Sequence, residues 1–526
     1  MQGAYDVVVV GGGHNGLVAA TYLARGGRRV AVLEARSTLG GPATTEEVRP
    51  GFRAPIASLV GLMRPEIIRE LNLARHGLQF VPFEPAVTSV GEDGHVLRLY
   101  NDPAQSAQAI AKFSAKDAES YVKFHDFLVR VAQTLDPLLL RTPPDGLNMS
   151  RGELVYFGRL ALRARKLGKW TMGQALRFPQ MALRLSLAEW FETELLKATL
   201  AVDALIGRWA GPWSPGTSFG LLQRFWPAVH GGVWAFVRGG TSALTDGLAA
   251  AARAAGVMIR TDAPVARILT QDGRTTGVQL ASGETVNAAV VASSADAKRT
   301  LLKLIDPSEL ELDVQRKIRH MRSTGGLAKI NLALSSLPAL KGGDGAPAPR
   351  IRFGPTLEYL ERAYDDAKYG RVSAEPYVDA VVPTVVDPSL APPGQHVMSI
   401  VAQFAPYALK RGTWKDEKDK FADKVVDRLD ALMPGLRRAV LARQVYTPVD
   451  LEEKFGLSGG HIYHGEMGTD QQMFMRPIPG MGRYRTPITG LYLCGSAAHP
   501  GGGITGAPGY NAAREILKDW GRRAPR

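Results

Sequence analysis

The first fifty residues alternate between apolar runs and glycine-rich breaks in a regular order. Four valines at 7–10 form an apolar run with strand character, and a glycine-rich stretch at 11–16 (GGGHNG) follows directly. Residues 17–24 continue as a helical stretch, and a second apolar run at 29–33 ends at Glu34. This order of strand, tight turn, helix and strand is typical of a Rossmann-like α/β domain.

The glycines of the first turn have the spacing of a dinucleotide-binding motif. Gly11, Gly13 and Gly16 give the order G-x-G-x-x-G. The first glycine permits a tight turn, the second lets the backbone approach a pyrophosphate, and the third allows the helix to pack closely on the strand. The start of the helix also favours phosphate charge. Glu34 follows at about the 20-residue distance where an acid accepts hydrogen bonds from a ribose. A dinucleotide site therefore explains the pattern better than a glycine-rich turn without a ligand.

Two later segments carry features of the same kind of domain. Residues 256–295 alternate apolar and polar positions around Asp-Gly at 272–273 and Ser-Gly at 282–283, which are hairpin signals. They predict an antiparallel meander with a returning strand, either in the cofactor domain or in a substrate domain. Residues 489–516 contain an apolar strand, a glycine cluster and a helix. The C-terminal part is therefore expected to fold back onto the first domain.

Two segments between these regions have helical patterns. Residues 114–132 start with Ser114 as a plausible N-cap and place apolar side chains at helical spacing, which predicts a cap helix. Residues 151–170 alternate basic residues with leucines. This second helix is either an ordinary solvated face or a face that docks on an anionic membrane or an apolar substrate.

Composition and charge narrow the classes of protein. The 526 residues exceed the roughly 100 to 200 residues of a typical domain, so at least two packed units are expected. Much of the excess behind the formal charge of +14 sits in one stretch, 151–170, which argues against a nucleic-acid partner. The single cysteine, Cys494, excludes an internal disulfide and favours a reducing, cytoplasmic compartment. Neither secretion nor a membrane span is expected, since a predicted strand starts at Tyr5 and no apolar run reaches about 18 residues.

The residues after Glu34 extend the motif into a family signature. The stretch LEARSTLGG at 33–41 resembles the signature of the flavoprotein amine oxidase and phytoene desaturase superfamily. Segments 196–207, 385–399, 459–466 and 475–503 are similar to the phytoene desaturase-like subgroup that includes the pyridine nucleotide-disulfide oxidoreductase domain-containing protein 2 family. The similarity covers nearly the whole chain. Because one cysteine offers no dithiol, thiol–disulfide chemistry is excluded.

The resemblance implies that FAD is the cofactor and that three parts of the chain bind it. Arg36 is either a phosphate contact or a surface arginine, and Val265 places its backbone against the adenine. His14 is expected to be a neutral contact, because a helix start lowers the pKa of an imidazole. The implied cofactor-binding residues are Gly11, Gly13, His14, Asn15, Gly16, Glu34, Ala35, Arg36, Gly40, Gly41, Val265, Gly495, Ser496, Gly503 and Ile504.

The implied fold is α/β, with an α+β substrate domain. A Rossmann-like FAD-binding domain of the glutathione-reductase/amine-oxidase type is interleaved with a mixed-sheet and helical substrate domain. The FAD-binding domain takes residues 1–95, 230–300 and 455–526. The substrate domain takes the helical segment 96–229 and the segment 301–454.

Candidate catalytic and substrate-binding residues follow from chemistry near these motifs. His499, beside the C-terminal glycine turn, is a candidate acid or base, with a structural hydrogen bond to the turn as its alternative role. His461, His464 and Glu466 lack the spacing of a metal site, so no metal is expected. Seven aromatic residues either line an apolar tunnel or belong to the core. These are Trp209, Trp213, Phe219, Phe225, Trp226, Trp234 and Phe236.

Three functions of different class fit these features. The leading hypothesis is an FAD-dependent oxidoreductase that desaturates or otherwise oxidises C–H bonds of a bulky apolar, isoprenoid or carotenoid-like substrate by hydride transfer to flavin N5. The second is a flavin amine oxidase. The third is an FAD-holding scaffold that binds a partner or a membrane through residues 151–170. An oligomer is compatible with all three.

Overall fold

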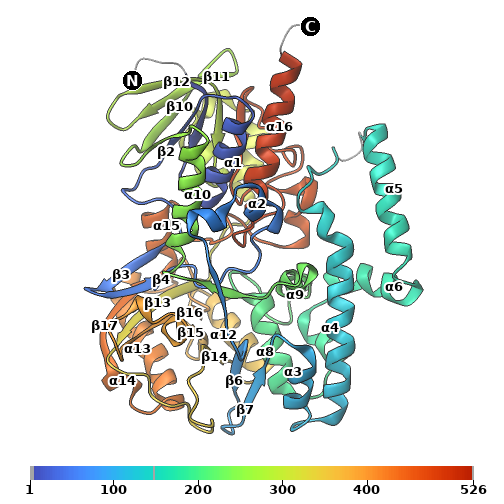
Figure 1. Cartoon of the computed structure of the whole chain (residues 1–526), viewed down its shortest axis with the longest axis vertical. Coiled ribbons are helices and arrows are strands. Elements are labelled where there is room, and N and C mark those ends of the chain that lie inside the picture. The colour runs from blue at the N-terminus through green and yellow to red at the C-terminus, as the bar shows by residue number, and fades with distance from the viewer. Residues whose placement is uncertain (1–4, 146–148, 524–526) are drawn as a thin grey trace.

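The computed structural model describes residues 5–145 and 149–523. Two sheets, each with its own helices, organise the chain, and the chain passes between them several times. In Figure 1 the first sheet lies in the upper part of the molecule with α1, α10 and α16, and the second sheet lies in the lower part. The predicted α/β architecture with a Rossmann-like domain is confirmed.

The first sheet has a parallel core in the order β9-β2-β1-β12-β18. Its strands are β1 (Tyr5–Val10), β2 (Val30–Leu33), β9 (Met258–Arg260), β12 (Thr285–Ser293) and β18 (Leu491–Leu493). Residues 7–10 and 30–33 are buried throughout. A strand in the middle of a covered parallel sheet needs apolar side chains on both faces, which explains the continuous valine run.

An antiparallel meander extends the first sheet from β12. β10 (Val265–Gln271) pairs with β11 (Arg274–Leu280), and β11 pairs with β12. Asp272 and Gly273 join the first pair with φ angles of 51° and 68°. Positive φ at both turn residues matches the right-handed twist of a hairpin, so the Asp-Gly signal identified the turn. The meander belongs to the cofactor domain, which decides between the two predicted placements.

The second sheet is mixed and runs in the order β17-β13-β16-β15-β14-β6-β7. β6 is parallel to β14, and the other neighbouring strands are antiparallel. The strands are β6 (Val87–Val90), β7 (Val96–Leu99), β13 (Leu327–Leu334), β14 (Arg350–Phe353), β15 (Tyr377–Val381), β16 (His396–Gln403) and β17 (Val440–Tyr446). Strand β6 falls within the 1–95 segment assigned to the cofactor domain, yet its pairing places it in the second sheet.

Short two-stranded ribbons and helices complete the two units. β3 (Thr45–Arg49) pairs with β4 (Phe52–Pro55), and β5 (Phe80–Pro82) pairs with β8 (Ala235–Val237). The longer helices are α1 (His14–Arg25), α3 (Pro103–Ile110), α4 (Ala115–Leu135), α5 (Arg151–Arg165), α6 (Lys169–Arg177), α8 (Glu194–Leu205), α10 (Ser242–Ala254), α11 (Leu312–His320), α12 (Leu357–Lys368), α13 (Trp414–Leu432), α15 (Pro448–Phe455) and α16 (Ala507–Arg523). The shorter ones are α2 (Pro65–Glu70), α7 (Leu183–Ala188), α9 (Phe219–Phe225) and α14 (Leu436–Ala439).

The helical segment that follows β7 in the chain includes the predicted cap helix and the predicted basic helix. Ser114 caps α4, since its hydroxyl accepts a hydrogen bond from the Asp117 N–H at 3.1 Å. The predicted basic helix is interrupted at Gly168, whose φ of 83° separates α5 from α6. Figure 1 shows these two helices standing apart at the edge of the molecule. In the described parts of the chain, no helix has the length and apolar character to cross a membrane.

Candidate active site

A groove of about 320 Å³ runs along the carboxyl ends of β1 and β2. It brings together predicted residues from positions 11 to 496 of the chain. The predicted residues that line it are Gly11, Gly13, His14, Asn15, Glu34, Ala35, Arg36, Gly40, Gly41, Val265 and Ser496. The N-terminal motif, the meander and the C-terminal segment therefore meet at one site, as the sequence predicted.

The three motif glycines differ in what surrounds them. Gly11 has a φ of 95°, which a residue with a side chain rarely adopts. A Cβ on Gly13 would meet no atom within 4 Å, so this glycine leaves an open face toward the groove. A Cβ on Gly16 would lie 2.2 Å from the Gly11 carbonyl oxygen. A Cβ on Gly495 would likewise lie 2.2 Å from the Ser294 carbonyl oxygen. Gly16 and Gly495 do not line the groove or the second cavity described below, so both act as packing positions.

The carboxylate of Glu34 joins the end of β2 to the glycine turn. The Gly12 N–H donates to Oε2 at 2.7 Å and the Arg36 N–H donates to Oε1 at 3.0 Å. The Arg36 guanidinium donates to the Gly41 carbonyl oxygen at 3.2 Å and lies over the Phe455 ring. Glu34 thus faces the groove from a fixed position, and Arg36 holds the wall of the groove together.

Three buried polar atoms at the groove have no hydrogen-bond partner within the described structure. They are Nε2 of His14, Oδ1 of Asn15 and Nδ1 of His464, and all three side chains line the groove. Buried polar atoms are nearly always hydrogen-bonded, so these fit a polar ligand such as the pyrophosphate and flavin ring of FAD. Burial and the nearby His464 lower the pKa of His14 to about 3, which keeps it neutral as predicted. Burial is the largest cause of this pKa shift.

A second cavity of about 230 Å³ adjoins the groove and lies between the two sheets. His14, His464 and Ser496 line both spaces, and Gly503 and Ile504 line the second cavity only. The remaining wall comes from both domains. Its apolar members are Ile56, Leu59, Leu62, Ile206, Trp234, Leu327, Val381, Val401, Leu451 and Ile462. The cofactor groove therefore opens into an apolar chamber.

The predicted aromatic cluster divides between the two roles proposed for it. Trp234 lines the second cavity, and Trp226 lines a neighbouring cavity of about 330 Å³. Phe225 and Phe236 are 7% and 2% exposed and belong to hydrophobic cores. Both alternatives are therefore realised by different members of the cluster.

Charged side chains in the second cavity are the main feature that the sequence did not reveal. Asp203, Arg224, Lys329, Arg350 and Asp379 line it and come from α8, α9, β13, β14 and β15. A signal was present, because several of these charges interrupt strands that are otherwise apolar. A charged residue in a fully buried strand must be paired or functional.

Lys329 is the charged residue of this wall that comes from β13. Its Nζ donates to Ser58 Oγ at 2.7 Å, and the side chain is 2% exposed. Burial lowers the pKa of Lys329 to about 7, with the Asp379 charge opposing this shift. The amine can therefore exchange a proton near neutral pH.

His499 is placed by the structure in a supporting position. It is 2% exposed, its Nε2 lies 2.9 Å from the Leu138 carbonyl oxygen, and it lines neither the groove nor the second cavity. Burial lowers the pKa of His499 to about 4. This placement favours the structural hydrogen bond over the predicted catalytic role.

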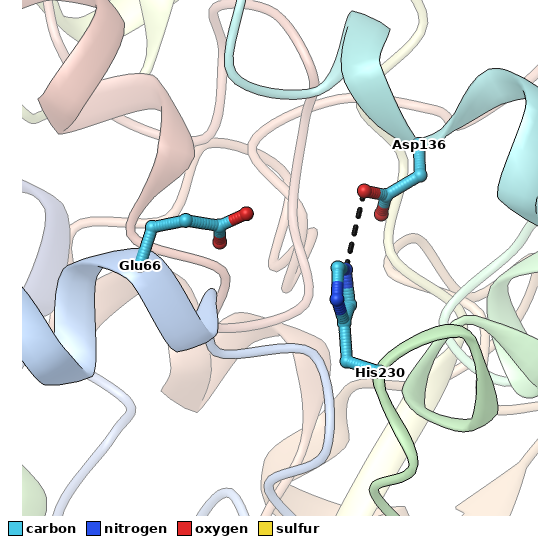
Figure 2. Close-up of side chains that lie close together, drawn as sticks. All are labelled: Glu66, Asp136 and His230. Carbon is cyan, nitrogen blue, oxygen red and sulfur yellow. Dashed lines mark hydrogen bonds and ion pairs between the residues drawn. The ribbon is translucent and has the colours of Figure 1, made fainter.

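One group of acidic and histidine side chains has the spacing of a cation site. Figure 2 shows Asp136 and His230 hydrogen-bonded at 3.1 Å, with Glu66 turned toward them. Arg64, which the view omits, donates to Asp136 Oδ2 at 3.0 Å and to Glu66 Oε1 at 3.1 Å. Burial opposes ionisation of Asp136, but Arg64 outweighs it and lowers the pKa of that carboxyl. The Arg64 guanidinium pairs with both acids and neutralises one of their two charges, so the group is an ion-pair cluster.

The remaining histidine and cysteine candidates are buried. His461 is fully buried with its Nε2 3.7 Å from Glu466 Oε2, and the three predicted residues at 461, 464 and 466 form no cation-sized group among the described residues. Burial raises the pKa of the Cys494 thiol to about 12, so this thiol stays protonated. Cys494 is therefore a small packing residue.

Fold and groove together define a dinucleotide-binding α/β protein whose groove adjoins a largely apolar cavity. Residues 16–517 match the family described as flavin containing amine oxidoreductase, and the chain belongs to this family. FAD is accordingly its cofactor, and the protein is an FAD-dependent oxidoreductase. The resemblance identified in the sequence is confirmed.

Similar proteins extend over nearly the whole chain. Pyridine nucleotide-disulfide oxidoreductase domain-containing protein 2 of Rattus norvegicus is 40% identical over 543 residues, covering 98% of this chain and 94% of the relative. Hydroxyneurosporene desaturase of Cereibacter sphaeroides is 30% identical over 536 residues, with 98% of each chain covered. A triple mutant of putrescine oxidase superposes with a TM-score of 0.63 at 14% identity, covering 99% of each chain, a likeness of fold alone.

Proposed function

We propose that this protein dehydrogenates a bulky, largely apolar substrate of the isoprenoid class inside the second cavity. The observation that carries the proposal is the continuity between the cofactor groove and an apolar chamber, through the shared residues His14, His464 and Ser496. The relative named as a hydroxyneurosporene desaturase supports the same class of substrate. When bound, FAD supplies the hydride acceptor.

The chain itself contributes orientation and exclusion of water. Ile206, Leu327 and Val401 form part of the apolar wall, so a hydrocarbon segment would be held there by burial alone. Loss of a hydride and a proton from adjacent carbons leaves one new double bond in the substrate. Lys329, whose pKa lies near 7, is the titratable side chain on this wall that can accept the proton.

The amine oxidase alternative is less well supported by the cavity. An ammonium substrate is best held by an excess of carboxylates or by an aromatic cage. The charged residues on this wall are instead three basic residues, at 224, 329 and 350, against two aspartates, at 203 and 379. A wall without an excess of carboxylates gives an ammonium group no net attraction, which counts against the amine oxidase alternative.

Product analysis tests the proposed function. FAD-loaded protein is incubated with neurosporene or geranylgeraniol in detergent micelles under anaerobic conditions, and products are analysed by chromatography and mass. We expect loss of two hydrogens from one of these substrates. In Val401→Phe, a ring fills the chamber and turnover should fall at least about tenfold with FAD content unchanged. Val122→Phe, on the exposed side of α4, serves as the control. Turnover of amines alone would contradict the proposal.

We further propose that α5 and α6 contact an anionic lipid surface. Neither helix buries a residue, and Leu154, Leu162 and Trp170 are 54%, 62% and 60% exposed. Exposed arginines on α5, including Arg159 and Arg163, lie on the same helix as these apolar side chains. Apolar and basic groups together on an exposed helix fit the headgroup region of a membrane, where an apolar substrate is dissolved.

A further inference from the structure

The substrate cavity has a charged wall that a pure hydrocarbon does not require. Asp203, Arg224, Lys329, Arg350 and Asp379 all face it. Burying charge is costly unless each charge is paired, and packed apolar residues of similar size are often as stable. The net charge of this wall therefore indicates the charge of the substrate group that binds to it.

Both aspartates on this wall are already paired. Arg350 donates from Nε and Nη2 to the two carboxylate oxygens of Asp379 at 2.9 and 2.5 Å. Arg224 donates from Nε to Asp203 Oδ2 at 2.9 Å. Arg352, which is 1% exposed, hydrogen-bonds to both aspartates. Three arginines thus share two carboxylates, and an excess of one positive charge remains even when the amine of the wall is neutral.

Arg224 is the arginine that presents the excess positive charge to the cavity. A guanidinium carries five N–H donors, and within the described residues only its Nε is hydrogen-bonded. Its side chain keeps 18% of its surface accessible, and it lines the second cavity. Burial lowers the pKa of Arg224, Asp203 opposes this shift, and the neighbouring Arg350 and Arg352 add to it. The Nη groups therefore remain for a ligand.

Lys329 provides a second donor on the same cavity. Its neutral amine has two N–H groups, and the described residues accept one hydrogen bond from it, at Ser58 Oγ. One excess positive charge with donors on both sides matches a group that carries a single negative charge and two acceptor oxygens. Arginine and lysine bind such a group with strong charge-assisted hydrogen bonds.

We propose that the cavity takes a substrate with an apolar body and a terminal carboxylate, held by Arg224 and Lys329. This inference rests on the proposed function and names its substrate class more closely. The carboxylate fixes which carbons of the apolar body lie nearest the cofactor groove, and it takes no part in the bond changes.

Matched acids and alcohols test the inference. Binding to the FAD-loaded protein is measured by the change in the flavin absorbance spectrum, with geranic acid against geraniol and geranylgeranoic acid against geranylgeraniol. We expect the acid of at least one pair to bind about tenfold or more tightly than its alcohol. Arg224→Gln should remove this preference with the affinity for the alcohol unchanged, and Arg224→Lys should restore part of it. Arg184→Gln, an exposed arginine outside the cavity, is the control.

The outcomes separate this inference from the proposed function. Equal binding of acid and alcohol, or an equal loss of both in Arg224→Gln, overturns the carboxylate site and leaves the apolar substrate in place. If none of these ligands perturbs the flavin spectrum, both statements fail. Lys329→Met supplies a second variant should Arg224→Gln not fold, and it should also reduce the preference for the acid.

Discussion

At the residue scale, Gly16 is a position where a single methyl group decides whether the cofactor site forms. Its Cβ would lie 2.2 Å from the Gly11 carbonyl oxygen, and a backbone atom cannot move aside cheaply. We expect Gly16→Ala to lose FAD and to lower stability by roughly 1–3 kcal/mol or more. Thermal unfolding and the flavin content of the purified protein measure both effects.

Gly158 in α5 provides the matched control for that substitution. A Cβ there would meet no atom within 4 Å, so Gly158→Ala should keep FAD and favour the helix by about 1 kcal/mol at most. A Gly16→Ala protein with full FAD content and an unchanged melting temperature would contradict the packing role of Gly16.

Glu466 is a buried carboxyl whose ionisation affects the stability of the fold at low pH. Burial opposes its ionisation, but His461, Arg208 and the Trp209 N–H at 2.9 Å outweigh this and lower the pKa of Glu466 from 4.5 to about 2. A carboxyl with a lowered folded pKa stabilises above its unfolded pKa, and this stability is lost as pH falls. We expect a loss on the order of 3 kcal/mol between about pH 4.5 and 2.

Denaturant unfolding at several pH values measures this dependence. Glu466→Gln should be less stable than the parent protein at neutral pH and should show a flatter decline below about pH 4.5. Glu311→Gln, at an exposed position, should follow the parent curve. An unchanged slope in Glu466→Gln would show that other groups carry the acid sensitivity.

At the element scale, α5 and α6 are separable from the FAD site. Their residues are not buried, whereas α1 packs between α10 and α16 beside the first sheet. Reversal of charge at Arg163, Arg165 and Lys166 should therefore abolish binding to vesicles that contain anionic lipid, with the flavin spectrum intact.

Vesicle co-sedimentation is the measurement, and the basic residues of α11 supply its control. Reversal at Arg316, Lys317 and Arg319 changes the net charge equally on a helix without a comparable exposed apolar face. Both variants should retain FAD. Equal loss of vesicle binding in both would indicate a non-specific effect of net charge and would count against an α5 surface.

At the scale of the whole molecule, the sequence predicted the parts of the fold that depend on local spacing. The glycine turn, the Asp-Gly hairpin at 272–273 and the capped helix after Ser114 each depend on neighbouring residues. The charged wall was not predicted, because it forms only in the tertiary structure. Asp203 on α8 and Asp379 on β15 are 176 positions apart in the chain, and both hydrogen-bond to Arg352. The sequence left two roles open for His499, because the partner that favours the structural role, Leu138, is distant in sequence.

The central claim is that an apolar substrate delivers its electrons to FAD in the chamber between the two sheets. The most direct test mixes the FAD-loaded protein with neurosporene under anaerobic conditions and follows the absorbance of oxidised flavin. We predict bleaching of the flavin with about one new double bond per flavin reduced, and at least about tenfold slower bleaching in Val401→Phe. A flavin that stays oxidised with isoprenoids but is bleached by putrescine would contradict the account.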